Sequence, residues 1–134
     1  GAVLVTTPQY VSVADVVRAK AMFDQTRITV LGLIENMSGF TDPATGKRID
    51  IFSKGGGEKA AQDMCVPFLG AIPIAPEVTE SGDKGVPIVY SHPDSEVSKA
   101  FVFAAEKLAA QVSIRNLVGE AARPLNAAVE TSTS

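Results

Sequence analysis

Residues 28–37 constrain the fold of this chain most strongly, because they read Ile-Thr-Val-Leu-Gly-Leu-Ile-Glu-Asn-Met. The stretch begins as a nearly continuous aliphatic and β-branched run, which is typical of a parallel strand covered by helices on both faces. Gly32 within it indicates a close approach by a neighbouring segment. The run ends in the polar pair Glu35 and Asn36, and open parallel sheets bind ligands at the carboxyl ends of their strands. The stretch therefore predicts a central strand with a candidate site at its end.

Apolar runs and helical patterns alternate on both sides of this strand. That alternation predicts an α/β fold in three layers, in which a largely parallel sheet carries helices on both faces. Residues 38–48 are rich in Gly, Pro, Asp and Thr and predict a loop, and 86–90 predict an extended segment. The other expected strands are Ala2–Thr6, a short one at 49–52, and 67–72, which Pro73 closes. The expected helices are 12–24, 58–64, 76–84 and a long helix that begins at 93–95. Ser12 begins the first of these helices in a capping box with Asp15.

The composition limits the partners and the compartment. The 134 residues carry a net charge of −3 and no basic cluster, which argues against nucleic acid or an anionic membrane as a partner. The lone Cys65 excludes an internal disulfide and fits a reducing compartment such as the cytoplasm. We expect residues 1–115 to form one domain and 116–134 a flexible tail, because helical periodicity is lost there. The start at Gly1, inside an apolar run, predicts a piece of a longer protein.

Several residues that could carry chemistry lack the partners that they would need. The chain contains neither G-x-x-x-x-G-K-[ST] nor G-x-G-x-x-G. His92 has no evident nucleophile beside it, so we expect a surface or capping role. Cys65 is expected to be a small buried side chain, since a metal or cluster ligand would need further thiolates. The glycines at 55–57 either present amides to an anion or form a turn.

Asn36 has two interpretations that the sequence leaves open. Its carboxamide offers a donor and an acceptor side by side, which match the hydrogen-bonding edge of adenine. The end of a central strand is a suitable place for that contact. Alternatively, the side chain caps the turn that follows the strand.

Six segments together resemble the Mrp/ApbC family of P-loop ATPases, which are related to MinD and ParA and carry iron–sulfur clusters. They are Gly-Ala-Val-Leu-Val-Thr-Thr-Pro-Gln (1–9), Val-Leu-Gly-Leu-Ile-Glu-Asn-Met-Ser (30–38), Ile-Phe-Ser-Lys-Gly-Gly-Gly-Glu-Lys (51–59), Phe-Leu-Gly-Ala-Ile-Pro-Ile (68–74), Gly-Asp-Lys-Gly-Val-Pro-Ile-Val (82–89) and His-Pro-Asp-Ser (92–95). The resemblance implies that Asn36, Pro73 and Ile74 line the adenine of ATP. It also implies a homodimeric parent ATPase that serves iron–sulfur client proteins.

Two departures from the family pattern shape the expected function. The family's phosphate loop precedes the first strand found here, so the chain resembles the carboxyl-terminal part of the ATPase and should not hydrolyse ATP alone. Asp42 and Thr45 stand where cluster-carrying members have a Cys-x-x-Cys pair. Thiolates hold such clusters, so this replacement argues against a cluster on this chain. A MinD/ParA-type positioning ATPase and a non-enzymatic scaffold remain the alternatives.

Overall fold

The computed structural model describes residues 1–42 and 44–121. β2 lies at the centre of the sheet, with β1 parallel to it on one side and β4 parallel to it on the other. The short β3 pairs antiparallel with the end of β2. In chain order the elements are β1 (Ala2–Thr6), α1 (Tyr10–Gln25), β2 (Val30–Thr41), β3 (Arg48–Ile49), α2 (Gly56–Asp63), β4 (Phe68–Ile74), α3 (Pro76–Asp83), α4 (Ile88–Ser91) and α5 (Glu96–Ala121).

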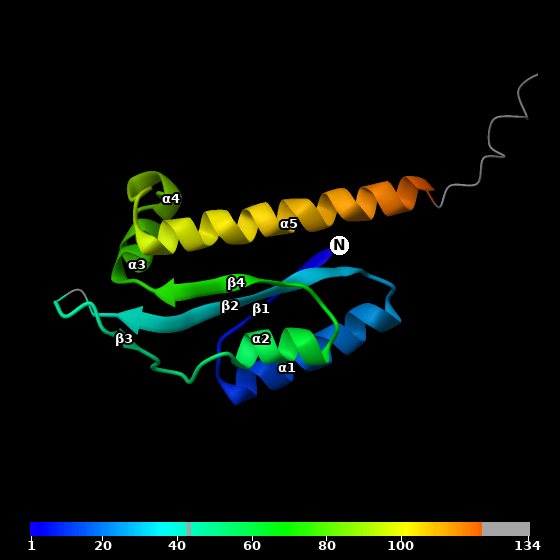
Figure 1. Ribbon diagram of the computed structural model, residues 1–134, viewed down its shortest axis with the longest axis horizontal. Helices are drawn as coiled ribbons and strands as arrows, with labels where there is room; N and C mark the ends of the chain where they lie inside the picture. The colour runs from blue at the N-terminus through cyan, green and yellow to red at the C-terminus, as the bar shows by residue number, and fades with distance from the viewer. Residues whose placement is uncertain (43, 122–134) are drawn as a thin grey trace, which may run out of the picture.

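The elements form three layers, as the sequence predicts. Figure 1 shows α1 and α2 on one face of the sheet and the long α5 on the other, with α3 and α4 beside the start of α5. This arrangement confirms the α/β fold with a largely parallel sheet. It also places the carboxyl ends of β2 and β4 at one end of the molecule, next to the α3–α4 lobe.

The core lies on both faces of β2, which explains its unbroken apolar sequence. Leu33 is completely buried and packs with Leu4 and Val16 against the α1–α2 layer. The next residue, Ile34, points the other way and packs beside Ile72 under α5. Burying a side chain of this size stabilises the fold by about 1.5–3 kcal/mol. The prediction of a central strand is therefore confirmed.

Gly32 confirms the predicted close approach. A Cβ atom built there would lie 2.6 Å from Cγ of Leu69 and 2.8 Å from the carbonyl oxygen of Pro67. Both atoms belong to the neighbouring β4 segment, so a side chain at position 32 would separate β2 from β4.

The predicted loop at 38–48 is wrong in its first part, because β2 continues to Thr41. Met37 has φ 57° and Gly39 has φ 77°, and the pairing of β2 with β4 shifts register between residues 36 and 40. The left-handed residues absorb the extra length as a bulge, after which pairing resumes. Pro73 accordingly lies inside β4 instead of closing it, since the shift leaves it without a partner in the ladder.

The expected capping box at Ser12 is wrong. Helix α1 already begins at Tyr10, and its cap residue Gln9 makes no side-chain capping bond. The Ser12 hydroxyl instead accepts the backbone N–H of Thr7 at 3.0 Å and contacts Oγ1 of Thr6 at 2.9 Å. Ser12 therefore ties the first turn of the helix to the end of β1.

The expected extended segment at 86–90 is also wrong, because Ile88–Ser91 forms the short helix α4. Ile88 is buried with Val97 of α5. The Ser98 hydroxyl donates to the carbonyl oxygen of Ile88 at 3.1 Å. Contacts with α5 thus decide the local conformation, which the short apolar run could not reveal.

Helix α5 packs on the sheet through only part of its apolar surface. Val97 and Ala104 are buried, whereas Phe101 and Val112, which follow the same helical spacing, are 38% and 39% exposed. The helix continues to Ala121, so residues 116–121 are helical instead of being part of a tail. Residues 122–134, where the rest of the expected tail falls, lie outside the described residues. No helix within the described ranges is both long and apolar enough to cross a membrane.

Candidate functional site at the carboxyl edge of the sheet

β2 and β4 end side by side, and the bulge divides this edge into two parts. Asn36 pairs with Ile72 and Phe40 pairs with Ile74, so three residues of β2 lie opposite Pro73 alone. Before the bulge, the Glu35 side chain bonds to the start of α2; after it, Phe40 and Thr41 lie beside α3 and the start of α5. A closed polar cluster occupies the first part and an open pocket the second.

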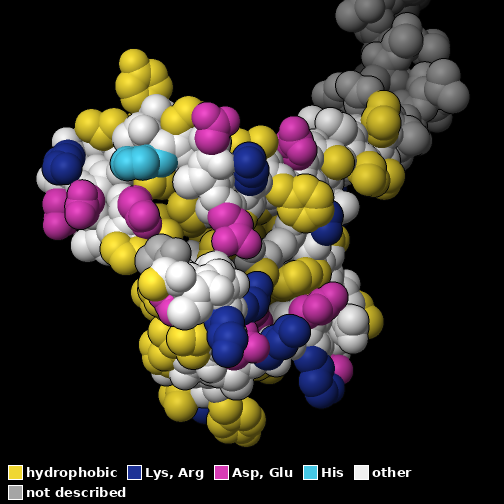
Figure 2. Space-filling view, turned by 60° about the vertical axis from the view of Figure 1, so that its left-hand side comes forward, with side chains coloured by type: hydrophobic (Ala, Val, Ile, Leu, Met, Phe, Trp, Pro, Cys, Tyr) yellow, Lys and Arg dark blue, Asp and Glu magenta, His cyan; other side chains and the backbone are white. Residues whose placement is uncertain are grey.

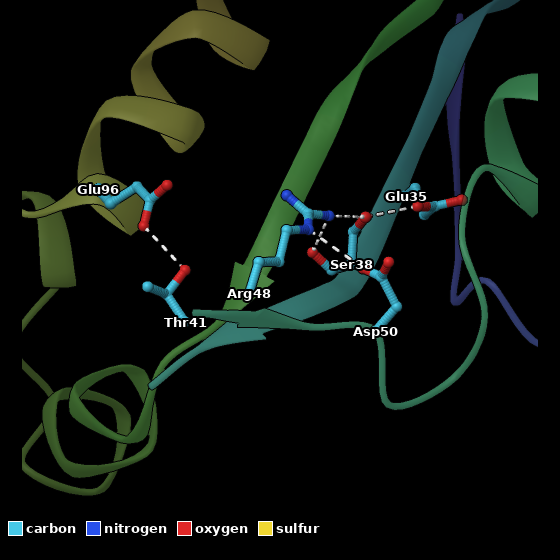
Figure 3. A network of polar contacts seen from close by, with 6 residues as sticks. All are labelled: Glu35, Ser38, Thr41, Arg48, Asp50 and Glu96. Atoms are coloured by element: carbon cyan, nitrogen blue, oxygen red, sulfur yellow. Dashed lines mark hydrogen bonds and ion pairs between the residues drawn. The ribbon is translucent and has the colours of Figure 1, made fainter. Parts of the chain in front are cut away.

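The closed part is the Glu35 cluster, formed by Glu35, Ser38, Arg48, Asp50 and Gly57 (Figure 3 shows the first four). The Glu35 side chain is only 2% exposed. Its Oε1 accepts the Ser38 hydroxyl at 2.6 Å, and its Oε2 accepts the backbone N–H of Gly57 at 2.6 Å. Charge-assisted bonds of this kind stabilise a buried carboxylate that would otherwise be costly. Glu35 thereby fastens the end of β2 to the first turn of α2.

Arg48 extends this cluster to the β2–β3 hairpin. Its Nη2 donates to the carbonyl oxygen of Ser38 at 2.8 Å, and its Nε donates to Oδ1 of Asp50 at 3.1 Å. Figure 3 shows the guanidinium lying between these two groups. Arg48 Nη2 also donates to the Ser38 hydroxyl at 3.4 Å, and that hydroxyl in turn donates to Glu35. The bonds of the cluster therefore join the end of β2 to the β2–β3 hairpin and to α2.

The glycines at 55–57 were expected either to present amides to an anion or to form a turn, and the structure shows a part of each. Gly55 has φ 75° at the cap of α2, which is the left-handed turn that the sequence allowed. Gly57 presents its amide to an anion, but the anion is the protein's own Glu35. A Cβ atom at position 57 would lie 2.9 Å from Cβ of Glu35. Glycine at 57 is therefore required for the carboxylate to reach the backbone.

The open part is the edge pocket, a hollow of about 270 Å³. Apolar side chains from the ends of β2 and β4 form much of its wall, and polar side chains from β2, α3 and α5 form its rim. Its lining residues are Phe40, Thr41, Pro73, Ile74, Ala75, Pro76, Glu77, Ser95, Glu96 and Val97. None of them is Lys, Arg or His, so the two carboxylates give the rim a negative potential.

One contact spans the rim of the edge pocket. The Thr41 hydroxyl at the end of β2 donates to Oε2 of Glu96 at the start of α5, over 3.4 Å (Figure 3). The other rim carboxylate, Glu77, is exposed on α3. Figure 2 shows further acidic side chains gathered over the neighbouring α3–α4 lobe. The surroundings of the pocket therefore favour ligand groups that donate hydrogen bonds over anionic ones.

The structure brings together two of the three predicted adenine-wall residues. Pro73 and Ile74 line the edge pocket, whereas Asn36 does not. Asn36 Oδ1 accepts the backbone N–H of the next residue, Met37, at 2.9 Å, so in this structure its carboxamide bonds locally to the backbone. The contact of Asn36 with adenine stays a prediction.

Asp42 and Thr45, which replace the family's cysteine pair, contact each other at the tip of the β2–β3 hairpin. Asp42 Oδ2 accepts the Thr45 hydroxyl at 2.5 Å, and Oδ1 accepts the backbone N–H of Ala44 at 2.9 Å. The Thr45 hydroxyl and then the Ala44 amide lower the pKa of Asp42. These bonds hold the hairpin turn. Within residues 1–42 and 44–121, no group of three or more His, Cys, Asp and Glu side chains is arranged to hold a metal.

Of the expectations for Cys65 and His92, the structure contradicts the first and confirms the second. Cys65 is exposed, so the expectation of a small buried side chain is wrong; its φ of 53° just after α2 turns the side chain outward. His92 is exposed, and its Nδ1 lies 3.0 Å from the hydroxyl of Ser91, which confirms the expected surface role.

Sequence reasoning missed the acidic residues that organise this edge. In the sequence, Glu35 stands out only as part of a polar pair, and Glu96 does not stand out. A carboxylate inside an otherwise apolar strand was a usable signal, because such a group is almost never buried without a partner. Glu96 gave no signal, since an acidic residue in the first turn of a helix is ordinary.

The fold and the parallel strand edge place the chain in the class of P-loop NTPase-like α/β proteins, and comparisons with known proteins agree. The chain is similar to the nucleotide-binding protein of Archaeoglobus fulgidus, solved in complex with ADP (TM-score 0.57, 38% identity, covering 63% of this chain and 35% of that one). It is also similar to the cell division ATPase MinD of Pyrococcus furiosus (TM-score 0.59, 28% identity, covering 86% and 42%).

The sequence comparisons define the family. An iron–sulfur cluster carrier protein of Synechocystis is 48% identical over 119 residues, which cover 88% of this chain and 34% of that protein. The model of the ParA family, described as "NUBPL iron-transfer P-loop NTPase", matches residues 1–109. The chain therefore belongs to the ParA/NUBPL family of iron-transfer P-loop NTPases. It spans about a third of the length of the curated iron–sulfur cluster carrier relatives it matches.

Proposed function

We propose that this chain forms the base-binding side of an ATP-dependent iron–sulfur cluster carrier and leaves the phosphate chemistry to another part of the protein. The edge pocket carries this proposal. It lies at the carboxyl ends of parallel strands, where open α/β sheets bind nucleotides, and Pro73 and Ile74 contribute to its wall.

The edge pocket fits a nucleoside better than a whole nucleotide. Its volume of about 270 Å³ is near the lower end of the roughly 300–1,000 Å³ typical of small-molecule sites. Phe40, Pro73 and Ile74 offer an apolar wall for a planar base, and Asn36 lies on the same strand as Phe40. The carboxylates of Glu77 and Glu96 would repel phosphates. The phosphates would therefore point away, toward groups that these 134 residues do not supply.

The wider role follows from the family. In the complete protein, ATP would lie at a homodimer interface, and its binding and hydrolysis would drive transfer of a cluster to iron–sulfur client proteins. Because Asp42 and Thr45 bond to each other and provide no thiolate, the cluster would be held by other means than a cysteine pair here. We place the protein in the cytoplasm, or in an organelle stroma or matrix in a eukaryote, without a nucleic-acid or membrane partner.

A positioning ATPase of the MinD/ParA type is the second candidate. The likeness to the Pyrococcus MinD structure, which covers 86% of this chain, favours it. Both proposed functions place a nucleoside in the edge pocket. They differ in the protein that the ATPase serves and not in this site.

Titration of the ¹⁵N-labelled chain with adenosine tests the base-binding proposal. We expect chemical-shift changes at the amides of Phe40, Thr41 and Ile74, with a dissociation constant on the order of a millimolar for so small a ligand. Ile74→Ala should weaken binding, whereas Ile51→Ala, which removes a half-exposed side chain outside the pocket, should not. If adenosine shifts none of the pocket amides, the chain is a scaffold that kept the fold without the nucleoside site.

The chain should also show no Mg²⁺-dependent ATP hydrolysis above background, because it lacks the phosphate-loop lysine and amides. A turnover that persists through repeated purification would contradict the assignment of this chain to the base side alone.

A further inference from the structure

We propose that Glu96 binds the ribose hydroxyls of the nucleoside, so that the edge pocket selects ribonucleosides over 2′-deoxyribonucleosides. This inference rests on the proposed function and adds a specificity to it. The carboxylate stands at the start of α5, on the rim of a pocket whose wall comes from the ends of β2 and β4.

The position of Glu96 leaves it able to accept further hydrogen bonds. Its side chain is exposed, and Oε2 accepts one long bond of 3.4 Å from the Thr41 hydroxyl. Within the described part of the chain the carboxylate forms no ion pair. A carboxylate offers about four acceptor sites, and one of them is used by Thr41, so further hydrogen bonds can form at the pocket that Glu96 lines. Figure 3 shows the second oxygen of Glu96 turned away from Thr41.

The ribose diol is the part of a nucleoside that this acceptor fits best. Its 2′ and 3′ hydroxyls are adjacent donors, and an acidic residue at the edge of an α/β sheet is a known partner for a ribose 2′-hydroxyl. The pairing edge of adenine is less suitable, because the acceptor N1 lies beside its single amino donor. Phosphate is excluded by charge. The base would then lie against Pro73 and Ile74, with the sugar between Thr41 and Glu96.

Glu96 differs from the other carboxylates near the pocket. Glu77 also lines the pocket, but it makes no contact across the rim in the described structure. Glu80, on the same helix as Glu77, is engaged by Lys84 at 3.6 Å and lies outside the lining. Glu80 therefore provides a charge-matched control.

The test compares adenosine with 2′-deoxyadenosine and with guanosine by NMR titration of the wild-type chain, Glu96→Gln and Glu80→Gln, and records a thermal melt of each. One hydrogen bond to an exposed carboxylate is worth roughly a fivefold difference in affinity. The wild-type chain and Glu80→Gln should therefore bind adenosine roughly fivefold more tightly than the deoxynucleoside. In Glu96→Gln the ratio should fall toward one, mainly because adenosine binds more weakly.

The outcomes separate this inference from the proposed function. If adenosine binds but the ratio is unchanged in Glu96→Gln, the ribose contact is wrong while the nucleoside site stands. If the variant changes the preference between adenosine and guanosine instead, Glu96 reads the base and the inference is overturned. If neither nucleoside binds, the proposed function itself fails. A lower melting temperature with an unchanged ratio would assign Glu96 only to the N-terminal dipole of α5.

Discussion

Glu35 on β2 and Glu96 on α5 are carboxylates that lie on opposite sides of the β2 bulge, one buried and the other exposed. Glu35 is 2% exposed and accepts two hydrogen bonds of 2.6 Å, one from a hydroxyl and one from a backbone amide. Glu96 is exposed and accepts a single bond of 3.4 Å. Both lie at the carboxyl edge of the sheet, so position alone does not distinguish their roles.

The difference lies in what each carboxylate can still do. The hydrogen bonds of Glu35 join β2 to α2 and leave it no access to solvent, so it maintains the architecture of the edge. Glu96 has acceptor sites left and faces a hollow with an apolar wall, so it can bind a ligand. A buried, fully bonded acid therefore indicates structure, and an exposed acid on a pocket rim indicates recognition. Four predictions test or refine this contrast, from the largest expected effect to the smallest.

Glu35→Ala should lower the free energy of unfolding by about 2–4 kcal/mol, because it leaves the Gly57 amide and the Ser38 hydroxyl buried without a partner. Glu96→Ala should lower it by about 0.5 kcal/mol or less, as is usual for an exposed side chain. Urea unfolding of the two variants measures both values. An equal decrease in the free energy of unfolding in the two variants would show that Glu35 and Glu96 do not differ in their structural roles.

Gly57→Ala should destabilise the fold by about 1–3 kcal/mol, because the added methyl group meets Glu35 in a packed environment. Gly82→Ala in helix α3 is the matched control, since nothing lies within 4 Å of the added methyl group. That substitution should stabilise the chain by about 0.5–1 kcal/mol, as expected for replacing a helical glycine. The shift in melting temperature should thus have opposite signs in the two variants. A neutral Gly57→Ala would show that α2 can move away from Glu35.

Asn36→Ala distinguishes the two interpretations of that residue. If the carboxamide pairs with adenine, adenosine affinity should fall roughly tenfold, because two neutral hydrogen bonds contribute about 0.5–1.5 kcal/mol each. The preference for adenosine over guanosine should shrink as well. The bond to the Met37 amide predicts a different result, namely a lower melting temperature with an unchanged base preference. Titration with both nucleosides and a thermal melt on the same sample decide between the two.

Thr45→Val should raise the pKa of Asp42 toward its ordinary value of 3.8, because the Thr45 hydroxyl is the main cause of the lowered pKa. A folded-state pKa below the unfolded value gives stability that is present above pH 3.8 and is lost as the pH falls through the folded pKa. The variant should therefore lose less stability on acidification than the wild type. A carboxyl ¹³C titration measures the pKa, and Thr79→Val, in an exposed position on α3, should leave it unchanged.

Much of the fold could be predicted because its signals are local. Residues 30–34 are apolar on both faces, which is typical of a strand covered on both sides, and the structure places Leu33 and Ile34 in opposite cores. The glycine of this strand also predicted a close neighbour correctly. Helix α3 was equally predictable, because Pro76 starts it and Gly85 follows it.

The candidate site was predictable only in outline. The position at the carboxyl edge, and the contribution of Pro73 and Ile74, followed from strand order and from family resemblance. The length of β2 did not, since a bulge that needs positive φ at Met37 resembles a loop in sequence. The exposure of Cys65 did not follow either, since its positive φ just after α2 leaves no mark in the sequence.

The sequence by itself determined the layers, the central place of β2 and the family, because these depend on hydrophobic pattern and on segments of consecutive residues. Only the tertiary structure decided which polar groups meet. Glu35 and Gly57 are 22 residues apart, and Thr41 and Glu96 are 55 apart. Such pairs form only when the packing of helices on the sheet brings distant backbone segments together. Whether a carboxylate is then buried with partners or left on an open rim depends on that packing and not on its neighbours in the chain.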